Sequence, residues 1–379
     1  MVGLWTCTVQ KRRFQLPLPD AAQKVDEGMS LASYIREAPK AELHLHLEGS
    51  IAPQSALEIA DRNGVALPTD LYDSVRRRYT FHDFQQFISL YIGISRCLRT
   101  VEDYEQITVE LGRRLAGQNV KYAEVTFTPS THSWLGVHHS TYFTGITRGR
   151  DRVLRELGVR IAWIFDIVRS IPDVERSRQL ADYTSAVAIE GKGNGVVALG
   201  LGGHEPGYPV DPFIPMFDRA RHAGLHSAPH AGETGGPENV WASIDRLGAE
   251  RIGHGIRAGE DPALVGTLAA RGIALEICPS SNLRLGVCPN FDHYPLRRFY
   301  EAGVPVILNT DDPALFEASL TDEFELMLEH GQISEVDLDE MLLNAVKFSF
   351  LEPADKAELT HQFHVDLTSL RETHLNAPR

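Results

Sequence analysis

The chain lacks the long apolar runs and the targeting segment that mark membrane and secreted proteins. No stretch approaches the roughly 18 uncharged apolar residues that a membrane span needs. The first apolar run, residues 2–9, precedes Lys11, Arg12 and Arg13, whereas a secretory signal has its basic residues ahead of the apolar run. We therefore expect a soluble, cytoplasmic protein.

Paired cysteines and a basic excess are also missing. The four cysteines form no C-x-x-C pair and no disulfide framework for a chain of 379 residues, so we expect reduced thiols. Acidic residues outnumber basic ones by 51 to 37, which gives a net charge of -14. Because phosphate binding relies on a basic footprint, we expect no nucleic-acid partner. The composition leaves open whether the protein is a homo-oligomer.

What the chain does contain is a regular alternation of strand-like and helix-like segments. Eight apolar or alternating runs are each followed by residues with helical spacing, and they cover residues 41–48, 121–128, 159–167, 196–201, 225–230, 251–254, 273–278 and 304–310. Strands that alternate with helices are parallel, and eight such units close a barrel. The sequence therefore predicts an α/β fold, a (β/α)8 TIM barrel.

The barrel is expected to form one domain over residues 39–350. The gap of about 70 residues between the first two predicted strands exceeds a single crossover, so we expect a helical insertion at about 51–117, a candidate lid. Amphipathic C-terminal helices follow the last strand, and residues 351–379 form a predicted helical extension. Residues 1–38 form a predicted N-terminal arm of mixed polarity.

Polar residues gather at the predicted carboxyl ends of the strands, where such barrels form their active sites. They are His44, His46 and Glu48 on strand 1, His230 and Glu233 after strand 5, His254 after strand 6, and Asp311 and Asp312 after strand 8. Three imidazoles and one carboxylate, with an open position for water, make a catalytic zinc-type site. Such a metal lowers the pKa of bound water from 15.7 to about 7. Glu233 is then free to protonate a substrate nitrogen, and His254 to orient or deprotonate the water.

Other interpretations of the H-x-H motif remain open. Binuclear hydrolases of the amidohydrolase superfamily also begin with it, but they commonly carry a bridging lysine at the end of strand 4, and the nearest lysine here, Lys192, precedes that strand. The H-x-E of residues 46–48 is similar to that of cytidine-deaminase-type enzymes, whose P-C-x-x-C partner is absent. A non-catalytic binding protein would be expected to lose Glu233 or a ligand, and the sequence keeps them all.

Four motifs in this order, HLHLEGS, HAGE, GHG and NTDDP, resemble the adenosine and adenine deaminase family over about residues 38–350. The resemblance implies a hydrolase with one zinc ion that replaces the 6-amino group of a purine by oxygen. It assigns the zinc ligands to His44, His46, His230 and Asp311. It also implies that Glu233 protonates purine N1, that His254 positions the hydroxide, that Asp312 bonds N7 and that the Gly203 amide meets N3.

The substrate branch is less clear from the residues. Glu48 stands where adenosine-type members usually have an Asp that meets the ribose 5' hydroxyl, which favours free adenine or a nucleoside lacking that hydroxyl. Gly203 instead follows the adenosine-type pattern. A 5'-modified nucleoside such as 6-aminodeoxyfutalosine, a menaquinone precursor, reconciles both residues, and free adenine is the alternative.

Two further groups of residues are candidates for substrate contact. Phe81 and Phe84 lie with Phe87 and Tyr91 at helical spacing, which suits either the core or a ligand-facing wall. A substrate carboxylate would need an anion-binding residue. Arg148 and Arg169 follow strands 2 and 3, but both are expected to be solvated surface arginines.

Overall fold

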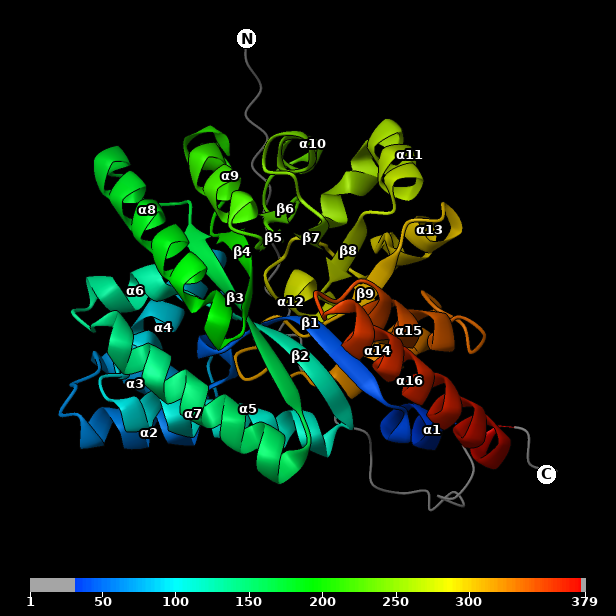
Figure 1. Cartoon of the computed structure of the whole chain (residues 1–379), viewed down its shortest axis with the longest axis horizontal. Coiled ribbons are helices and arrows are strands. Elements are labelled where there is room, and N and C mark those ends of the chain that lie inside the picture. The colour runs from blue at the N-terminus through cyan, green and yellow to red at the C-terminus, as the bar shows by residue number, and fades with distance from the viewer. Residues whose placement is uncertain (1–30, 376–379) are drawn as a thin grey trace, which may run out of the picture.

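The computed structural model describes residues 31–375, in which parallel strands lie at the centre and helices surround them (Figure 1). The strands are β1 (Lys40–His46), β2 (Val120–Phe127), β3 (Arg160–Val168), β4 (Val196–Gly202), β5 (His226–Ser227), β6 (His230–Ala231), β7 (Arg251–His254), β8 (Ala274–Ile277) and β9 (Val306–Leu308). They pair in sequence order as two parallel sheets, β1 to β5 and β6 to β9.

Hydrogen bonds join the two sheets at both ends. Asp311, after β9, pairs with β1 by donating its N–H to the His44 carbonyl at 3.1 Å and accepting from the His46 N–H at 2.8 Å. On the other side, the Gly253 N–H of β7 reaches the Pro229 carbonyl, between β5 and β6, at 3.0 Å. The strands therefore close into the predicted (β/α)8 barrel.

The predicted strands agree with the observed ones, with two local differences. The fifth predicted strand is broken into β5 and β6, because Pro229 between them has no N–H to donate to a ladder. The first strand ends at His46 rather than at Glu48, which instead begins the short 3-10 helix η1 (Glu48–Ser50).

The helices fall into three groups along the chain. Those between β1 and β2 are α2 (Pro53–Arg62), α3 (Thr69–Arg76), α4 (Phe84–Ser95) and α5 (Val101–Gly117). Those that alternate with the remaining strands are α6 (Pro129–Trp134), α7 (His139–Leu157), α8 (Val174–Glu190), α9 (Ile214–His222), α10 (Pro237–Arg246), α11 (Pro262–Arg271), α12 (Pro279–Arg284) and α13 (Leu296–Glu301). The C-terminal ones are α14 (Leu320–Glu329), α15 (Leu338–Lys347) and α16 (Pro353–His374).

Local sequence signals explain where the inserted helices begin. Asp83 caps α4 by accepting a hydrogen bond from the Gln86 N–H, and Thr100 with Asp103 forms a capping box at the start of α5. Helix α5 packs along α7 in the outer ring, whereas α4 carries aromatic side chains to the end of the barrel where the polar strand ends lie. The helical insertion predicted at 51–117 thus consists of α2 to α5.

The chain termini of the described part meet on one side of the barrel. Most of the predicted arm over residues 1–38 lies outside the described residues, and of its remainder Leu31–Glu37 forms helix α1. Helix α16, the predicted extension, packs beside α1 and α15 (Figure 1). Among residues 31–375, no helix combines the length and the apolar character needed to cross a membrane.

Charged side chains fill the barrel floor below the polar strand ends. Arg251 on β7 is buried between two buried carboxylates, Glu124 on β2 and Glu276 on β8, with both ion pairs at 2.5 Å. Its guanidinium also lies over the ring of Phe350, 3.7 Å from the ring centre. Because β2 and β7 are not neighbours in the sheets, these ion pairs connect strands across the inside of the barrel.

Candidate active site

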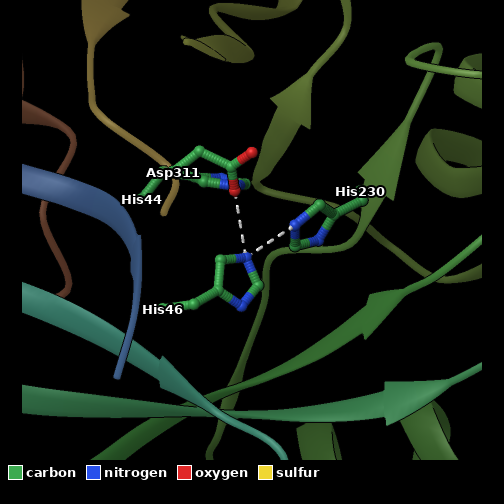
Figure 2. A group of neighbouring side chains, drawn as sticks. All are labelled: His44, His46, His230 and Asp311. Carbon is green, nitrogen blue, oxygen red and sulfur yellow. Dashed lines mark hydrogen bonds and ion pairs between the residues drawn. The ribbon is translucent and has the colours of Figure 1, made fainter. Parts of the chain in front are cut away.

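Four side chains converge at the carboxyl end of the barrel: His44 and His46 from β1, His230 from β6 and Asp311 from the loop after β9 (Figure 2). The His46 Nε2 lies 3.3 Å from the His230 Nε2 and 3.3 Å from the Asp311 Oδ1. The His44 Nε2 lies 3.4 Å from the same oxygen. One potential ligand atom from each residue falls within 4.8 Å of all the others, so the structure brings together the predicted ligand set in one cluster.

The hydrogen bonds around this cluster leave its ligand atoms free for a cation. The His44 Nδ1 donates a hydrogen bond to the Glu276 carboxylate at 2.7 Å. The buried Nε2 of the same ring has no hydrogen-bond partner. The Ser281 hydroxyl donates to the Asp311 Oδ2 at 2.7 Å and leaves Oδ1 toward the imidazoles. An unpartnered imidazole nitrogen and a carboxylate oxygen aimed at one point are the donors that a divalent metal binds.

The pKa values of the clustered side chains are shifted strongly by burial and by one another. Against the effect of burial, the neighbouring carboxylates of Asp311 and Glu276 raise the pKa of His44 to about 10. Burial and the neighbouring His44 and His46 instead lower the pKa of His230 well below its ordinary value. Against burial, hydrogen bonds from His44 and His46 hold the pKa of Asp311 well below its usual range.

The backbone is strained where it presents two of these residues. His254 and Asp311 adopt positive φ angles of 59° and 65°, in the left-handed region that side chains other than glycine rarely occupy. Two glycines of the sequence motifs provide space nearby. A Cβ on Gly253 would lie 2.8 Å from the His44 ring, and a Cβ on Gly49 would overlap the Asp312 carboxylate. The GHG and HLEGS motifs thus need glycine for close packing.

Glu233 and His254 lie beside the cluster and form a second group with Asp311. The His254 Nε2 is 3.9 Å from a Glu233 carboxylate oxygen. Burial, together with the charges of Asp311 and Glu205, raises the pKa of Glu233 well above its ordinary value, which favours the protonated carboxyl. Burial lowers the pKa of His254 to about 3, so its imidazole is neutral. The site therefore holds an acid and a neutral base side by side.

A buried glutamate that the sequence analysis missed holds the loop of Glu233. The Glu205 carboxylate accepts hydrogen bonds from four consecutive backbone N–H groups, those of residues 232–235, at 2.8 to 3.1 Å. It follows directly on the GLGGH sequence that ends β4, and this position at a strand end was the available signal.

Arg169 supports the same loop from below, and its predicted role as a solvated surface arginine is wrong. The side chain is fully buried, donates to the His230 carbonyl at 2.6 Å and lies 3.9 Å from Glu205. A guanidinium can be buried here because carboxylates surround it, which a single sequence does not reveal. Arg148 is exposed, as predicted.

A cavity of about 140 Å³ opens above the cluster. Its floor includes His46, His230, Glu233, His254, Asp311 and Asp312, and its walls include Phe84, Phe87, Tyr91, Trp134, Val168, Ile171 and Leu180. Gly202 and Gly203 line it at the end of β4, and Asp166 lines it at the end of β3. Of the residues predicted to touch substrate, Gly203, Asp312 and Phe84 thus line the cavity, whereas Phe81 packs against Phe87 and Phe316 and is not part of its lining.

Glu48 lies behind the cavity wall rather than in it. Because β1 ends at His46, the Glu48 side chain turns toward the end of β2, where it accepts hydrogen bonds from the Thr128 N–H at 3.1 Å and from the His132 ring at 2.9 Å. The Tyr104 hydroxyl contacts the other ring nitrogen of His132 at 2.8 Å. Glu48 is therefore part of a buried polar chain, and Thr128 is its link to the cavity lining.

A parallel (β/α)8 barrel with three histidines and one aspartate at its strand ends defines a metal-dependent amidohydrolase. Residues 39–365 match the family model described as adenosine deaminase. The chain belongs to the adenosine deaminase family, hydrolases that act on C–N bonds in cyclic amidines.

Two relatives and one solved structure that are named for a deaminase activity are similar to this chain over most of its length. It is 37% identical to the aminodeoxyfutalosine deaminase of Streptomyces coelicolor, over 93% of this chain and 90% of the relative. It is 36% identical to the adenine deaminase of Cupriavidus necator, over 87% and 92% of the two chains. The crystal structure of an adenine deaminase from Arthrobacter aurescens is 31% identical, with a TM-score of 0.81 over 88% of this chain and 99% of that one.

Proposed function

We propose that the protein is a zinc-dependent aminohydrolase that replaces the 6-amino group of an adenine-containing nucleoside by oxygen and releases ammonia. The observation that carries the proposal is the buried Glu233 beside a cluster of four candidate metal ligands at the floor of one cavity. Family membership supports the reaction class.

The donor set fits one zinc ion. Imidazole nitrogen with a single carboxylate is typical of catalytic zinc, and His44, His46, His230 and Asp311 would hold it. When bound, zinc supplies the Lewis acidity that makes water nucleophilic at neutral pH. No lysine lies at the end of β4 to bridge a second ion, which favours one metal over the binuclear alternative.

Glu233 and His254 divide the proton transfers between them. Glu233, whose raised pKa favours the protonated carboxyl, donates its proton to purine N1, which reduces the aromatic resistance of C6 to attack. His254 is neutral, and its Nδ1 lies 3.2 Å from the Asn282 side-chain amide. Its Nε2 edge then orients the attacking water and accepts a proton from it. In the same addition step, Glu233 therefore acts on the purine and His254 acts on the water.

Asp312 and Gly203 hold the purine ring. Burial and the charge of Asp311 raise the pKa of Asp312 well above its ordinary value, which favours the protonated carboxyl that can donate to the N7 acceptor. The Gly203 amide faces N3 from the end of β4. Phe84 and Phe87 provide an apolar wall for the ring. Glu48 acts on the substrate indirectly, through the Thr128 segment.

The cavity chemistry favours an uncharged nucleoside over a nucleotide. Its described lining residues include no lysine or arginine, so neither a substrate phosphate nor the carboxylate of 6-aminodeoxyfutalosine would meet a cation among them. The walls continue beyond the floor to Trp134, which leaves room for a 5' substituent such as that of 6-aminodeoxyfutalosine. Two curated relatives from Streptomyces that are named aminodeoxyfutalosine deaminase support this compound, and with it a place in menaquinone biosynthesis. Free adenine is the second candidate, supported by other relatives.

The proposal is tested by ammonia release from adenine, adenosine, 5'-deoxy-5'-methylthioadenosine and 6-aminodeoxyfutalosine, compared by kcat/KM. We expect 6-aminodeoxyfutalosine to give the highest value. A higher value for adenine would move the protein to the free-base branch, and no release from any of the four would contradict the deaminase proposal. Metal analysis should give one zinc per chain, and two tightly bound ions would support the binuclear alternative.

A further inference from the structure

One carboxylate in the cavity is used by none of the steps above. Asp166 lies at the end of β3 and lines the cavity, yet its side chain is buried, with 4% exposure of the residue, and its Oδ1 has no hydrogen-bond partner. Among the described residues it also forms no ion pair. A buried carboxylate without partners is costly unless a ligand supplies them.

The fold makes room for this carboxylate. A Cβ on Gly200 would lie 2.8 Å from the Asp166 Oδ1, and a Cβ on Gly202 would overlap its Oδ2. The two glycines of β4 that face it therefore leave a cradle that any other residue would fill. The GLGG sequence therefore provides the space that the Asp166 carboxylate occupies.

The position of Asp166 relative to the purine follows from the proposed function, on which this inference rests. Gly203 faces N3, and N9, which carries the sugar of a nucleoside, is separated from N3 by one ring carbon. Asp166 lies against Gly202, the residue before Gly203, so a purine whose N3 met the Gly203 amide would bring its sugar edge toward Asp166. The lining continues past it through Ser130 and Thr131 to Trp134, so there is space for a group beyond the base.

We propose that Asp166 binds the ribose hydroxyls of the substrate. A carboxylate accepts hydrogen bonds from two neighbouring hydroxyls at once, and charge-assisted bonds of this kind are strong in a buried site. The Asp166 site thereby selects a ribonucleoside over the free base and over sugars that lack these hydroxyls.

The test combines substrate and side-chain deletions. kcat/KM is measured for adenosine, 2'-deoxyadenosine, 3'-deoxyadenosine, 2',3'-dideoxyadenosine and adenine, under single-turnover conditions where rates are low. We expect Asp166→Ala to reduce kcat/KM for adenosine about 10- to 100-fold more than for 2',3'-dideoxyadenosine. Asp166→Asn, whose amide oxygen still accepts one bond, should fall between. The surface variant Asp182→Asn is the control and should leave every value unchanged.

The outcomes separate this inference from the proposed function. Equal losses for all sugars, or a loss confined to adenine with its N9–H, would overturn the role of Asp166 while leaving the deaminase intact. A wild-type protein that releases ammonia from no adenine compound would instead contradict the proposed function. Thermal melting of Asp166→Ala provides a further readout. If Asp166 serves only to bind substrate, its removal should not lower Tm, whereas a structural role predicts a clear decrease.

Discussion

Glu233 is a carboxyl group whose pKa lies well above its ordinary value, because burial and the negative charges of Asp311 and Glu205 oppose its ionisation. His254, 3.9 Å away, is kept neutral by burial. The same surroundings thus prepare one group to give a proton and the other to take one, as in sites where paired titratable groups have their pKa values shifted apart.

Replacing the acid should abolish most activity without emptying the metal site. We expect Glu233→Gln to lower kcat by about 100- to 10,000-fold, the range typical of general acid–base catalysis, because the amide cannot deliver a proton to N1. Ammonia release and zinc content are measured on the same preparation. Glu175→Gln, on the exposed first turn of α8, is the control. Near-normal turnover by Glu233→Gln would exclude it as the acid.

The raised pKa also predicts a pH profile. The active, protonated form of Glu233 predominates below its raised pKa and is lost as the pH rises through it, so kcat/KM should fall on the alkaline side. In Glu233→Gln this titration is absent, and the residual activity should not show the same decrease. An unchanged alkaline limb in the variant would assign the titration to another group.

At the scale of the elements, the sequence predicts most of the barrel because hydrophobic alternation marks its strands locally. The sequence also predicts that His44, His46, His230 and Asp311 lie close together, because each follows or ends a predicted strand at the same end of the barrel. The direction of Glu48 was not predictable, since it depends on β1 ending two residues early in a 3-10 turn. The burial of Arg169 and Glu205 was not predictable because it depends on partners distant in sequence, although Asp166 could have been found as the lone acid in an apolar strand.

Glu205 is expected to act as a positioning residue for the acid loop. Glu205→Gln replaces one acceptor oxygen by a donor that faces backbone N–H groups, so the loop of Glu233 should shift. We expect kcat to fall about 10- to 100-fold with little change in KM, and the alkaline limb of the pH profile to move. Glu238→Gln, exposed on α10, is the matched control. A loss of Tm with unchanged kcat would indicate a purely structural role.

At the scale of the whole molecule, Arg251 connects strands that are remote in the barrel and, through Glu276, reaches His44, one of the proposed metal ligands. The chain Glu124, Arg251, Glu276, His44 therefore links packing of the barrel floor to the orientation of a ligand. A substitution in the barrel floor should therefore lower both the free energy of unfolding and the affinity for the metal.

Removing the Arg251 guanidinium takes away the cation that lies between the buried carboxylates of Glu124 and Glu276. We expect Arg251→Met to reduce the free energy of unfolding by about 3–5 kcal/mol, as measured by urea denaturation. Zinc affinity, measured by chelator competition, should also fall because His44 loses its fixed carboxylate partner. The exposed Arg271→Met should change stability by less than about 0.5 kcal/mol. Unchanged stability and affinity in Arg251→Met would refute the link.

Metal removal should destabilise the entire barrel. The four ligands come from β1, β6 and the loop after β9, so a bound ion joins the two ends of the strand order. Dialysis against a chelator is expected to abolish ammonia release and to lower Tm, and added zinc should restore both. A chelated protein with full activity would contradict the metal site.

The positive φ angles of His254 and Asp311 carry a consequence for how this chain can evolve. Glycine would relax the backbone at either position, yet it would also delete a side chain on which the chemistry depends. Selection for turnover therefore keeps the protein less stable than its own fold permits. A lineage released from that selection would be expected to drift to glycine there first, and to gain robustness as it lost activity.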